Sequence, residues 1–310
     1  MFATPTMLCS FQKINPVGIH LKPISTLSQP FGKVRPNCST YFSFTIAAPG
    51  PRSSVRLSHR SLTSPPAAIM LHENPVVSDL YATAISGCVA FSFLKLWEET
   101  AKRGLFDQKL NRKLVHISIG LAFMLCWPLF SSGSQGSIFA ALIPGVNIIR
   151  MLLLGLGILK HEATVKSMSR FGDYRELLKG PLYYATTITL ACVMYWRTSP
   201  LSIAAICNLC AGDGMADVIG RRFGVKKIPY NQNKSLAGSF AMAAAGFVAS
   251  LGYMYYFSSF GYLEESWKLV LGFLIVSLST AVVESLPISS ELDDNLTVPI
   301  TSILVGSIVL

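Results

Sequence analysis

The chain has 310 residues, of which 51% are apolar and only 14% are charged, well below the ~25% of a typical soluble domain. This composition is typical of a membrane protein and excludes an ordinary soluble enzyme. The net charge of +10 does not indicate nucleic-acid binding, because residues 1–72 contain seven Lys or Arg and no acid, whereas residues 73–310 contain nineteen basic and sixteen acidic residues. Most of the excess positive charge therefore belongs to the N-terminal segment.

The N-terminal segment has the composition of an organelle transit peptide. Residues 1–72 hold sixteen Ser or Thr and nine Pro but no long apolar run, which distinguishes them from a secretory signal. Ser, Thr and Pro outnumber Arg, and this favours a plastid over a mitochondrial address. A disordered cytosolic tail is the alternative. We predict a cleaved, disordered chloroplast transit peptide over residues 1–65.

The remainder, residues 73–310, is predicted to form one polytopic membrane domain. A bilayer core needs about 20 apolar residues per helix. Apolar segments near that length recur along the chain and predict an all-α integral membrane protein, a bundle of about seven to eight transmembrane helices in which the fourth and last are short. The predicted spans are 76–97, 114–131, 136–159, 181–196, 199–220, 236–260, 267–286 and 296–310.

The basic residues indicate which ends of the spans lie together. The long connections 98–113, 160–180 and 221–235 hold five Lys or Arg each, whereas the opposite connections hold only Arg197 and Lys268. The positive-inside bias places the three long loops on one side, which in a plastid membrane is the stroma.

Arg150 lies inside the third predicted span. A charge at membrane depth costs roughly 2.5 to 3.5 kcal/mol or more, so it marks a function or a partner. Because it shares a helix face with Asn147 and Pro144 at spacing three, Arg150 is predicted to point into the bundle.

The stretch 207–239 carries the main candidate site. Asp213 and Asp217 are four residues apart, so on a helix they share one face about 6 Å apart. Such a pair predicts a Mg²⁺ site, since Mg²⁺ takes one or two carboxylates together with phosphate oxygens. The alternative is a pair of acids salt-bridged to Arg221 and Arg222, with Asp217 and Arg221 as an i,i+4 pair.

Further cations and hydroxyls predict phosphate binding near these acids. Lys234 and Ser235 open the sixth span, and the free N–H groups of a helix start favour anions there. An N-cap serine is the alternative interpretation of Ser235. His116 follows two cations in LNRKLVH and is either a base or phosphate contact, or a structural histidine. No Walker A loop or protein-kinase signature occurs in the sequence, which excludes a soluble-type nucleotide fold.

Five motifs in order give the sequence a family resemblance. RKLVH, ELLKGPLYY, AGDGMADVIGRRFG, KIPYNQNKSLAGS and ESLPISSELDDN resemble those of the plastid phytol kinase and farnesol kinase family, within the wider polyprenol kinases. The resemblance covers the chain from about residue 75 to its C terminus. It implies a multi-pass chloroplast membrane enzyme that phosphorylates phytol, and also geranylgeraniol or farnesol, with CTP, in phytol salvage and tocopherol biosynthesis.

Alternatives remain open at this stage. Farnesol as the main substrate is one. The GDG-x-x-D and K-S-x-x-G patterns also resemble lipid cytidylyltransferases, and a transporter of an anionic lipid or metabolite is the non-enzymatic rival. The expected partners are an isoprenoid alcohol, a nucleoside triphosphate and membrane lipid, and no nucleic acid. The predicted catalytic residues are Asp213, Asp217 and Asp294; the predicted Mg²⁺ ligands are Asp213, Asp217 and Asp293; the predicted nucleotide-binding residues are Arg112, Lys113, His116, Lys179, Arg221, Arg222, Lys234 and Ser235.

Overall fold

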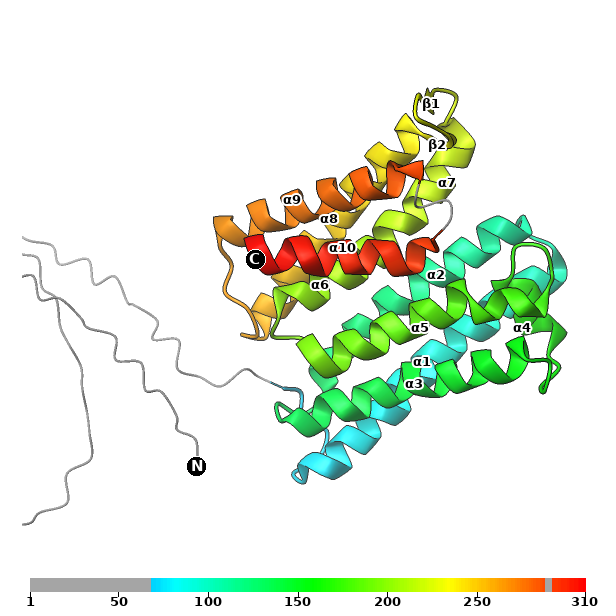
Figure 1. Cartoon of the computed structure of the whole chain (residues 1–310). Helices are drawn as coiled ribbons and strands as arrows, with labels where there is room; N and C mark the ends of the chain where they lie inside the picture. Colours follow the sequence, from blue (N-terminus) through cyan, green and yellow to red (C-terminus); the bar gives the residue numbers. More distant parts are fainter. Residues whose placement is uncertain (1–67, 288–291) are drawn as a thin grey trace, which may run out of the picture. The chain divides into compact units, whose positions relative to one another are not determined.

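The computed structural model describes residues 68–287 and 292–310, which form a bundle of helices with a small β-hairpin (Figure 1). The predicted transit peptide over residues 1–65 lies outside the described residues. Six helical stretches are long and apolar enough to cross a membrane, which confirms the predicted all-α membrane class. They are Pro75–Arg103, Gln108–Leu129, Ser134–Gly155, Pro200–Phe223, Leu236–Ser259 and Trp267–Ser285.

The two short predicted spans also form helices. The fourth is α5 (Gly180–Leu190), which continues into the π-helical turn η3 (Ala191–Tyr195), and the last is α10 (Asp294–Val309). The other elements are α1 (Pro75–Arg103), α2 (Gln108–Leu125), η1 (Trp127–Leu129), α3 (Ser134–Gly155), α4 (Glu162–Met168), η2 (Tyr174–Leu178), α6 (Pro200–Cys207), η4 (Asn208–Asp213), α7 (Gly214–Phe223), β1 (Lys227–Ile228), β2 (Asn231–Ser235), α8 (Leu236–Ser259) and α9 (Trp267–Ser285).

Capping side chains set where several helices begin. Asn74, Ser199, Ser266 and Asp293 each accept a hydrogen bond from a backbone N–H in the first turn of α1, α6, α9 and α10. These bonds satisfy donors that a helix start leaves unpaired. At the other end of α1, Gly104 takes a left-handed conformation with φ 64°, which glycine adopts without strain and which turns the chain toward α2.

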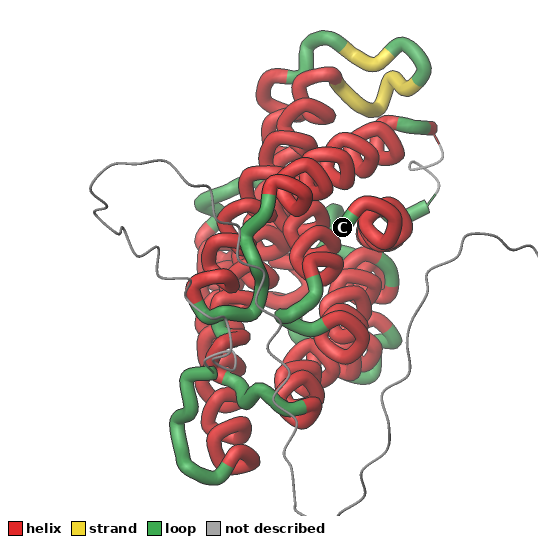
Figure 2. The backbone as a smooth tube through the Cα atoms, turned by 90° about the vertical axis from the view of Figure 1, so that its left-hand side faces the viewer, coloured by secondary structure: helices red, strands yellow, loops and turns green. Residues whose placement is uncertain are grey.

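Two groups of helices make up the bundle. Helices α1 and α2 pack against each other, α3 packs on both α1 and α5, and α8, α9 and α10 pack with the α6–η4–α7 stretch (Figures 1 and 2). Where these groups meet, Arg197 is 1% exposed and donates to the backbone carbonyls of Trp127, Phe130 and Ser131 at 2.6 to 2.8 Å. This buried guanidinium joins the connection between η3 and α6 to η1 and the two residues that follow it.

Helix α6 runs into α7 through the π-helical turn η4. A π turn inserts one extra residue per turn and is frequent at functional sites. Asn208 begins this turn, is fully buried, and accepts a hydrogen bond at Oδ1 from Thr280 of α9 (3.2 Å). Asp213 ends it. The irregular turn thus ends in the acid that begins the predicted Asp213 and Asp217 pair.

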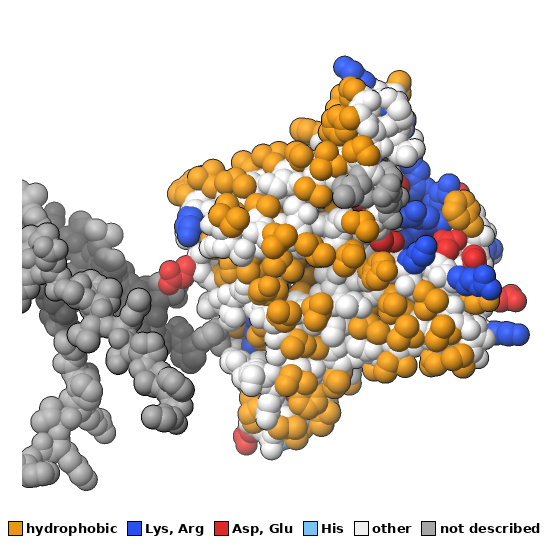
Figure 3. All heavy atoms as spheres, viewed as in Figure 1, with side chains coloured by type: hydrophobic (Ala, Val, Ile, Leu, Met, Phe, Trp, Pro, Cys, Tyr) orange, Lys and Arg blue, Asp and Glu red, His pale blue; other side chains and the backbone are white. Residues whose placement is uncertain are grey.

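The basic loops lie at one end of the bundle, as the charge pattern predicts. Lys109, Arg170 and Lys227 come from the three long connections, and all three line the same pocket. Figure 3 shows Lys and Arg side chains gathered near the ends of α2 and α7, with acidic side chains among them, while the flanks of the bundle are apolar.

Candidate active site

A pocket of about 960 Å³ at this charged end, hereafter the polar pocket, brings together most of the predicted site residues. Eight basic and five acidic side chains line it, so cations are in excess, as a polyphosphate requires. Ten predicted residues are among them: Arg112, Lys113, Lys179, Asp213, Asp217, Arg221, Lys234, Ser235, Asp293 and Asp294. They come from α2, η4, α7, β2 and α10, together with Lys179 and Asp293, which directly precede α5 and α10.

Asp213 is the most deeply placed of these acids, with 2% of its surface exposed. Lys113 Nζ donates to its Oδ2 at 2.7 Å, and His116 Nε2 lies 3.3 Å from the same oxygen. Both partners stand on α2, about a hundred positions earlier in the sequence. A buried carboxylate needs such partners, because an unpaired charge is costly away from water. The RKLVH and GDGMAD motifs therefore form one contact.

Asp217 pairs with Arg221 one turn further along α7 through two side-chain hydrogen bonds. Arg221 also lies 3.6 Å from Asp107, at the start of α2. The i,i+4 ion pair that the sequence left open as an alternative is therefore present. Asp217 still lines the polar pocket, so its predicted metal and catalytic roles remain predictions.

Lys234 is placed by the β-hairpin. Its Nζ donates to Glu284 at the end of α9 and to Asp294 at the start of α10 (3.1 Å). Burial lowers the pKa of Lys234, but the carboxylates of Asp294 and Glu284 outweigh it, so the pKa lies above its usual value and the ammonium stays charged. Asn231 holds the hairpin in place by donating to the carbonyls of Ser285 (3.0 Å) and Leu286 (3.2 Å).

Ser235 caps α8. Its hydroxyl accepts from the N–H of Gly238 at 3.1 Å, which is the simpler of the two interpretations of this serine. The first turn of α8 crosses α7 closely: a Cβ at Gly238 would meet the carbonyl oxygen of Ala216 at 2.9 Å. Glycine in the NKSLAGS motif therefore lets the lysine-bearing hairpin approach the helix that carries Asp217.

The two adjacent acids of α10 have different environments. Asp293 caps the helix, accepting from the N–H of Asn295 (3.0 Å) and from its side-chain amide (2.6 Å). Asp294 accepts from Lys234 at Oδ2, while its Oδ1 is buried and has no hydrogen-bond partner within residues 68–287 and 292–310. A buried carboxylate oxygen without a donor is a place where a cation fits.

These carboxylates fit a Mg²⁺ ion that is shared with phosphate. Over the described part of the chain, no group of three or more His, Cys, Asp or Glu side chains is close enough to hold a metal ion. Mg²⁺ bound by one or two carboxylates completes its shell with water and phosphate oxygens. Asp213 and Asp294 both line the same pocket as the cations, and Asp294 has a carboxylate oxygen without a partner among the described residues, so these two acids are the best-placed ligands.

Two of the predicted nucleotide-binding residues do not line the polar pocket. Arg222 is exposed, does not line the polar pocket, and places its guanidinium over the ring of Phe223. His116 lines a second, apolar pocket beside the first. Its Nε2 lies 2.7 Å from the carbonyl oxygen of Leu209. Because a carbonyl only accepts, Nε2 carries the hydrogen, and in the neutral ring Nδ1 is then the proton acceptor.

Sequence reasoning missed several pocket residues. Lys109 and Arg170 were counted among the loop cations, but nothing in their spacing distinguishes them from Lys102 or Lys166. Glu284 lies near the end of the seventh predicted span, and its position there indicates no partner. Its contact with Lys234 depends on the β-hairpin, whose KIPYNQNKS sequence has a Pro and polar residues that favour a turn. The further pocket residues not predicted include Tyr183 and Asn233.

Known proteins resemble the chain over most of its length. It is 79% identical over 241 residues to a probable phytol kinase 3, chloroplastic, of Glycine max, covering 78% of this chain and 76% of that protein. It is 65% identical over 240 residues to the farnesol kinase, chloroplastic, of Arabidopsis thaliana (77% and 78% covered). It is 42% identical over 261 residues to phytol kinase 1, chloroplastic, of the same plant (84% of each).

No protein-family model matches the chain, and no solved structure matches it. The relatives alone are sufficient to assign the chain to a family, because identities of this size over more than two thirds of both chains indicate common descent. With its membrane-spanning helices, the chain belongs to the chloroplastic phytol kinase and farnesol kinase family.

Proposed function

We propose that the protein is an isoprenoid alcohol kinase that transfers the γ-phosphoryl group of CTP to phytol, and also to geranylgeraniol and farnesol, at the stromal face of a chloroplast membrane. The product is the isoprenyl monophosphate, which serves phytol salvage and tocopherol biosynthesis. The observation that carries the proposal is the polar pocket, where eight cations surround buried carboxylates at one end of a membrane bundle. The names of the relatives support the alcohol class.

Phosphoryl transfer needs alignment and charge neutralisation more than covalent help. The alcohol oxygen attacks the γ-phosphorus, a new P–O bond forms, and the bond to the β-phosphate oxygen breaks to release CDP. Lys113, Lys179 and Arg112 line the pocket at the junction of α2 and α5, where they bind phosphate oxygens. Bound Mg²⁺ would neutralise charge on the phosphates, held by Asp213 and Asp294.

The proton of the alcohol needs an acceptor as the P–O bond forms. His116 suits this role, because its ring lines the apolar pocket while its Nε2–H is engaged by Leu209 and lies near Asp213. Asp213 fixes the orientation of the ring and stabilises the positive charge that develops on it. His116 and Asp213 thus link the apolar pocket, which His116 lines, to the polar pocket, which Asp213 lines.

Isolated membranes with CTP labelled at either the α- or the γ-phosphate test the proposal. A kinase places the γ label in the lipid product. The α label in the lipid would show cytidylyl transfer instead. Transport of an anionic lipid without nucleotide turnover would show a transporter. Competition with UTP and ATP tests the choice of donor.

Two variants test the site itself. Asp213→Asn should lower kcat at least a hundredfold, because it removes the negative charge that faces Lys113 and His116. Glu265→Gln makes the same chemical change at an exposed residue of the α8–α9 connection and should leave the rate unchanged. Normal activity of Asp213→Asn in well-expressed protein would refute the assignment of the site.

A further inference from the structure

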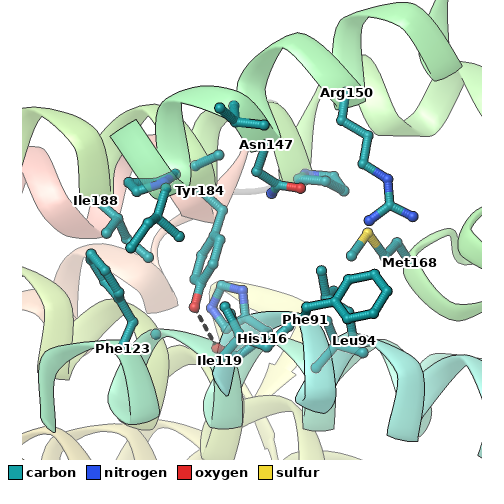
Figure 4. A pocket seen from close by; sticks show the side chains of 18 of the residues that line it. Phe91, Leu94, His116, Ile119, Phe123, Asn147, Arg150, Met168, Tyr184 and Ile188 are labelled. Atoms are coloured by element: carbon teal, nitrogen blue, oxygen red, sulfur yellow. Dashed lines mark hydrogen bonds between the residues drawn. The ribbon is translucent and has the colours of Figure 1, made fainter. Parts of the chain in front are cut away.

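An apolar pocket of about 660 Å³ lies beside the polar pocket, between the α1–α2 pair and the α3–α5 pair. Figure 4 shows it from close by: Phe91, Leu94, Ile119 and Phe123 approach from one side, while Asn147 and Tyr184 approach from the other. The Tyr184 hydroxyl donates to the backbone carbonyl of His116 at 2.7 Å and so ties the two walls together. A cavity of this size is typical of small-ligand sites.

The two ends of the apolar pocket differ in chemistry. At one end lie Arg112, which lines both pockets, and Arg150, which donates to Glu98 (3.2 Å) and Thr164 (2.7 Å). At the other end lie Phe123 and Ile188, which are only 4% and 3% exposed. The pocket therefore has a cationic mouth beside the polar pocket and a closed end lined mainly by buried apolar side chains.

Gly180 lines the apolar pocket beside Arg112, the residue that lines both pockets, at a place hereafter called the passage between the pockets. A Cβ built on Gly180 would press on the guanidinium of Arg112 and would lie 3.1 Å from Asn295 and 3.4 Å from Asp293, so a side chain here would displace Arg112. A hydroxyl group at this passage would stand beside the cations of the polar pocket, with the rest of its molecule in the apolar pocket.

One flank of the apolar pocket faces the membrane. Phe91 of α1 and Leu142 and Val146 of α3 line the pocket and are also 55%, 48% and 65% exposed. These residues belong to membrane-spanning helices, so their exposed surface contacts lipid tails. An apolar molecule dissolved in the bilayer can thus enter sideways between α1 and α3 without crossing water.

We infer that the apolar pocket holds the isoprenoid tail of the acceptor alcohol, which enters between α1 and α3, and that its closed end at Phe123 and Ile188 selects the chain length. The inference rests on the proposed function. On α2 the lining runs from Arg112 to Phe123, and at 1.5 Å per residue this gives a depth of about 16 Å. Phytol and geranylgeraniol, which are one isoprene unit longer than farnesol, reach further toward the closed end.

Gly87 offers a way to shorten the pocket with little strain. It lines the pocket on α1, and a Cβ built there meets nothing within 4 Å. Gly87→Leu therefore fills the pocket near its closed end, and Gly87→Ala fills it less. Gly252 on α8 is exposed, lies outside the pocket and has equally open space, so Gly252→Leu is the matched control.

The first measurement is photolabelling of the full-length protein in membranes with a geranylgeraniol analogue that carries a diazirine at its far end. Mass spectrometry should find the label on residues near Phe123 and Ile188. Label confined to the outer surface of α8 or α9 would overturn the inference. Photolabelling does not depend on catalysis, so it tests the tail site even if no alcohol is phosphorylated. A protein that binds the label near Phe123 and Ile188 but phosphorylates no alcohol would refute the proposed function and leave the tail site standing.

The second measurement compares kcat/KM for geraniol, farnesol and geranylgeraniol. Gly87→Leu should lower the value for geranylgeraniol about tenfold or more relative to geraniol, because crowding by one methylene in an apolar site already costs about tenfold. Gly87→Ala should give a smaller change of the same sign, and Gly252→Leu none. An equal loss for all three alcohols, or an unchanged length profile beside normal activity, would refute chain-length selection.

Discussion

Replacing Lys234 with Met tests whether the hairpin lysine holds the site together, binds phosphate, or does both. Lys234 is the cation between the carboxylates of Glu284 and Asp294, which stand on different helices. Glu284 is only 4% exposed. Lys234→Met keeps most of the apolar stem but removes the ammonium, so it leaves two carboxylates facing each other without their shared partner.

The expected cost in stability is large. Breaking a buried ion pair by removing one partner costs about 3 to 5 kcal/mol, because the remaining charge is uncompensated. For a domain of this size each kcal/mol lowers the melting temperature by about 2 to 4 °C, so a decrease of about 6 to 20 °C is expected in detergent. Lys227→Met, an exposed change in the same hairpin, should stay within about 0.5 kcal/mol of wild type.

The double variant Lys234→Met/Glu284→Gln separates the two roles. Removing the charge of Glu284 relieves the repulsion, so at least half of the lost melting temperature should return, measured by thermal unfolding of the purified protein. Kinase activity should not return, because the ammonium that we predict to bind phosphate is still missing. If the double variant regains activity together with stability, Lys234 has only a structural role and the phosphate assignment is refuted.

Three further substitutions have expected outcomes. Gly180→Ala should lower kcat/KM for alcohol phosphorylation about tenfold or more with an unchanged melting temperature, because its Cβ displaces Arg112 from the passage between the pockets; unchanged kinetics would contradict this. Gly238→Ala should lower stability by about 1 to 3 kcal/mol in thermal unfolding, because its Cβ presses on the carbonyl of Ala216. Arg197→Met removes three buried hydrogen bonds from a charged donor, at about 1 to 3 kcal/mol each, so membranes should contain far less folded protein. The protein that folds should keep its KM for CTP.

The membrane architecture is predictable because its signals are local. Each span is identified by the length of its apolar segment, and each basic loop by its own lysines and arginines, so neither prediction needs tertiary contacts. The same holds for Arg150, whose spacing with Asn147 and Pro144 already places the three on one face, and all three line the apolar pocket. The hairpin was not predicted because its two strands are short and because it is anchored by Asn231 to Ser285 at the end of α9 and to Leu286 directly after it.

The candidate site is predictable only as a set of residues, not as a set of pairs. Sequence spacing relates Asp213 to Asp217, but the structure gives these acids different partners, Lys113 on α2 for the first and Arg221 on α7 for the second. The pairing of Asp213 with Lys113 crosses about a hundred residues and follows from the packing of α2 against η4, which no local pattern encodes. Asp217 and Arg221, four apart on one helix, could be paired from spacing alone.

The position of Arg112 explains why a kinase of this kind needs two pockets of opposite character. A triphosphate requires cations and water at the membrane face, whereas an isoprenoid alcohol is soluble only in the bilayer, so the reacting atoms have to meet at a boundary. Arg112 lines both pockets, and His116 reaches from the wall of the apolar pocket to Asp213 in the polar one. Under the proposed function, helix α2 spans the boundary between the two substrates. Substitutions at Arg112 and Lys113 should therefore raise the KM for the nucleotide, whereas substitutions at Ile119 and Phe123 should raise the KM for the alcohol. A nucleotide KM that changes equally along the whole helix would show that the two substrates do not occupy separate pockets.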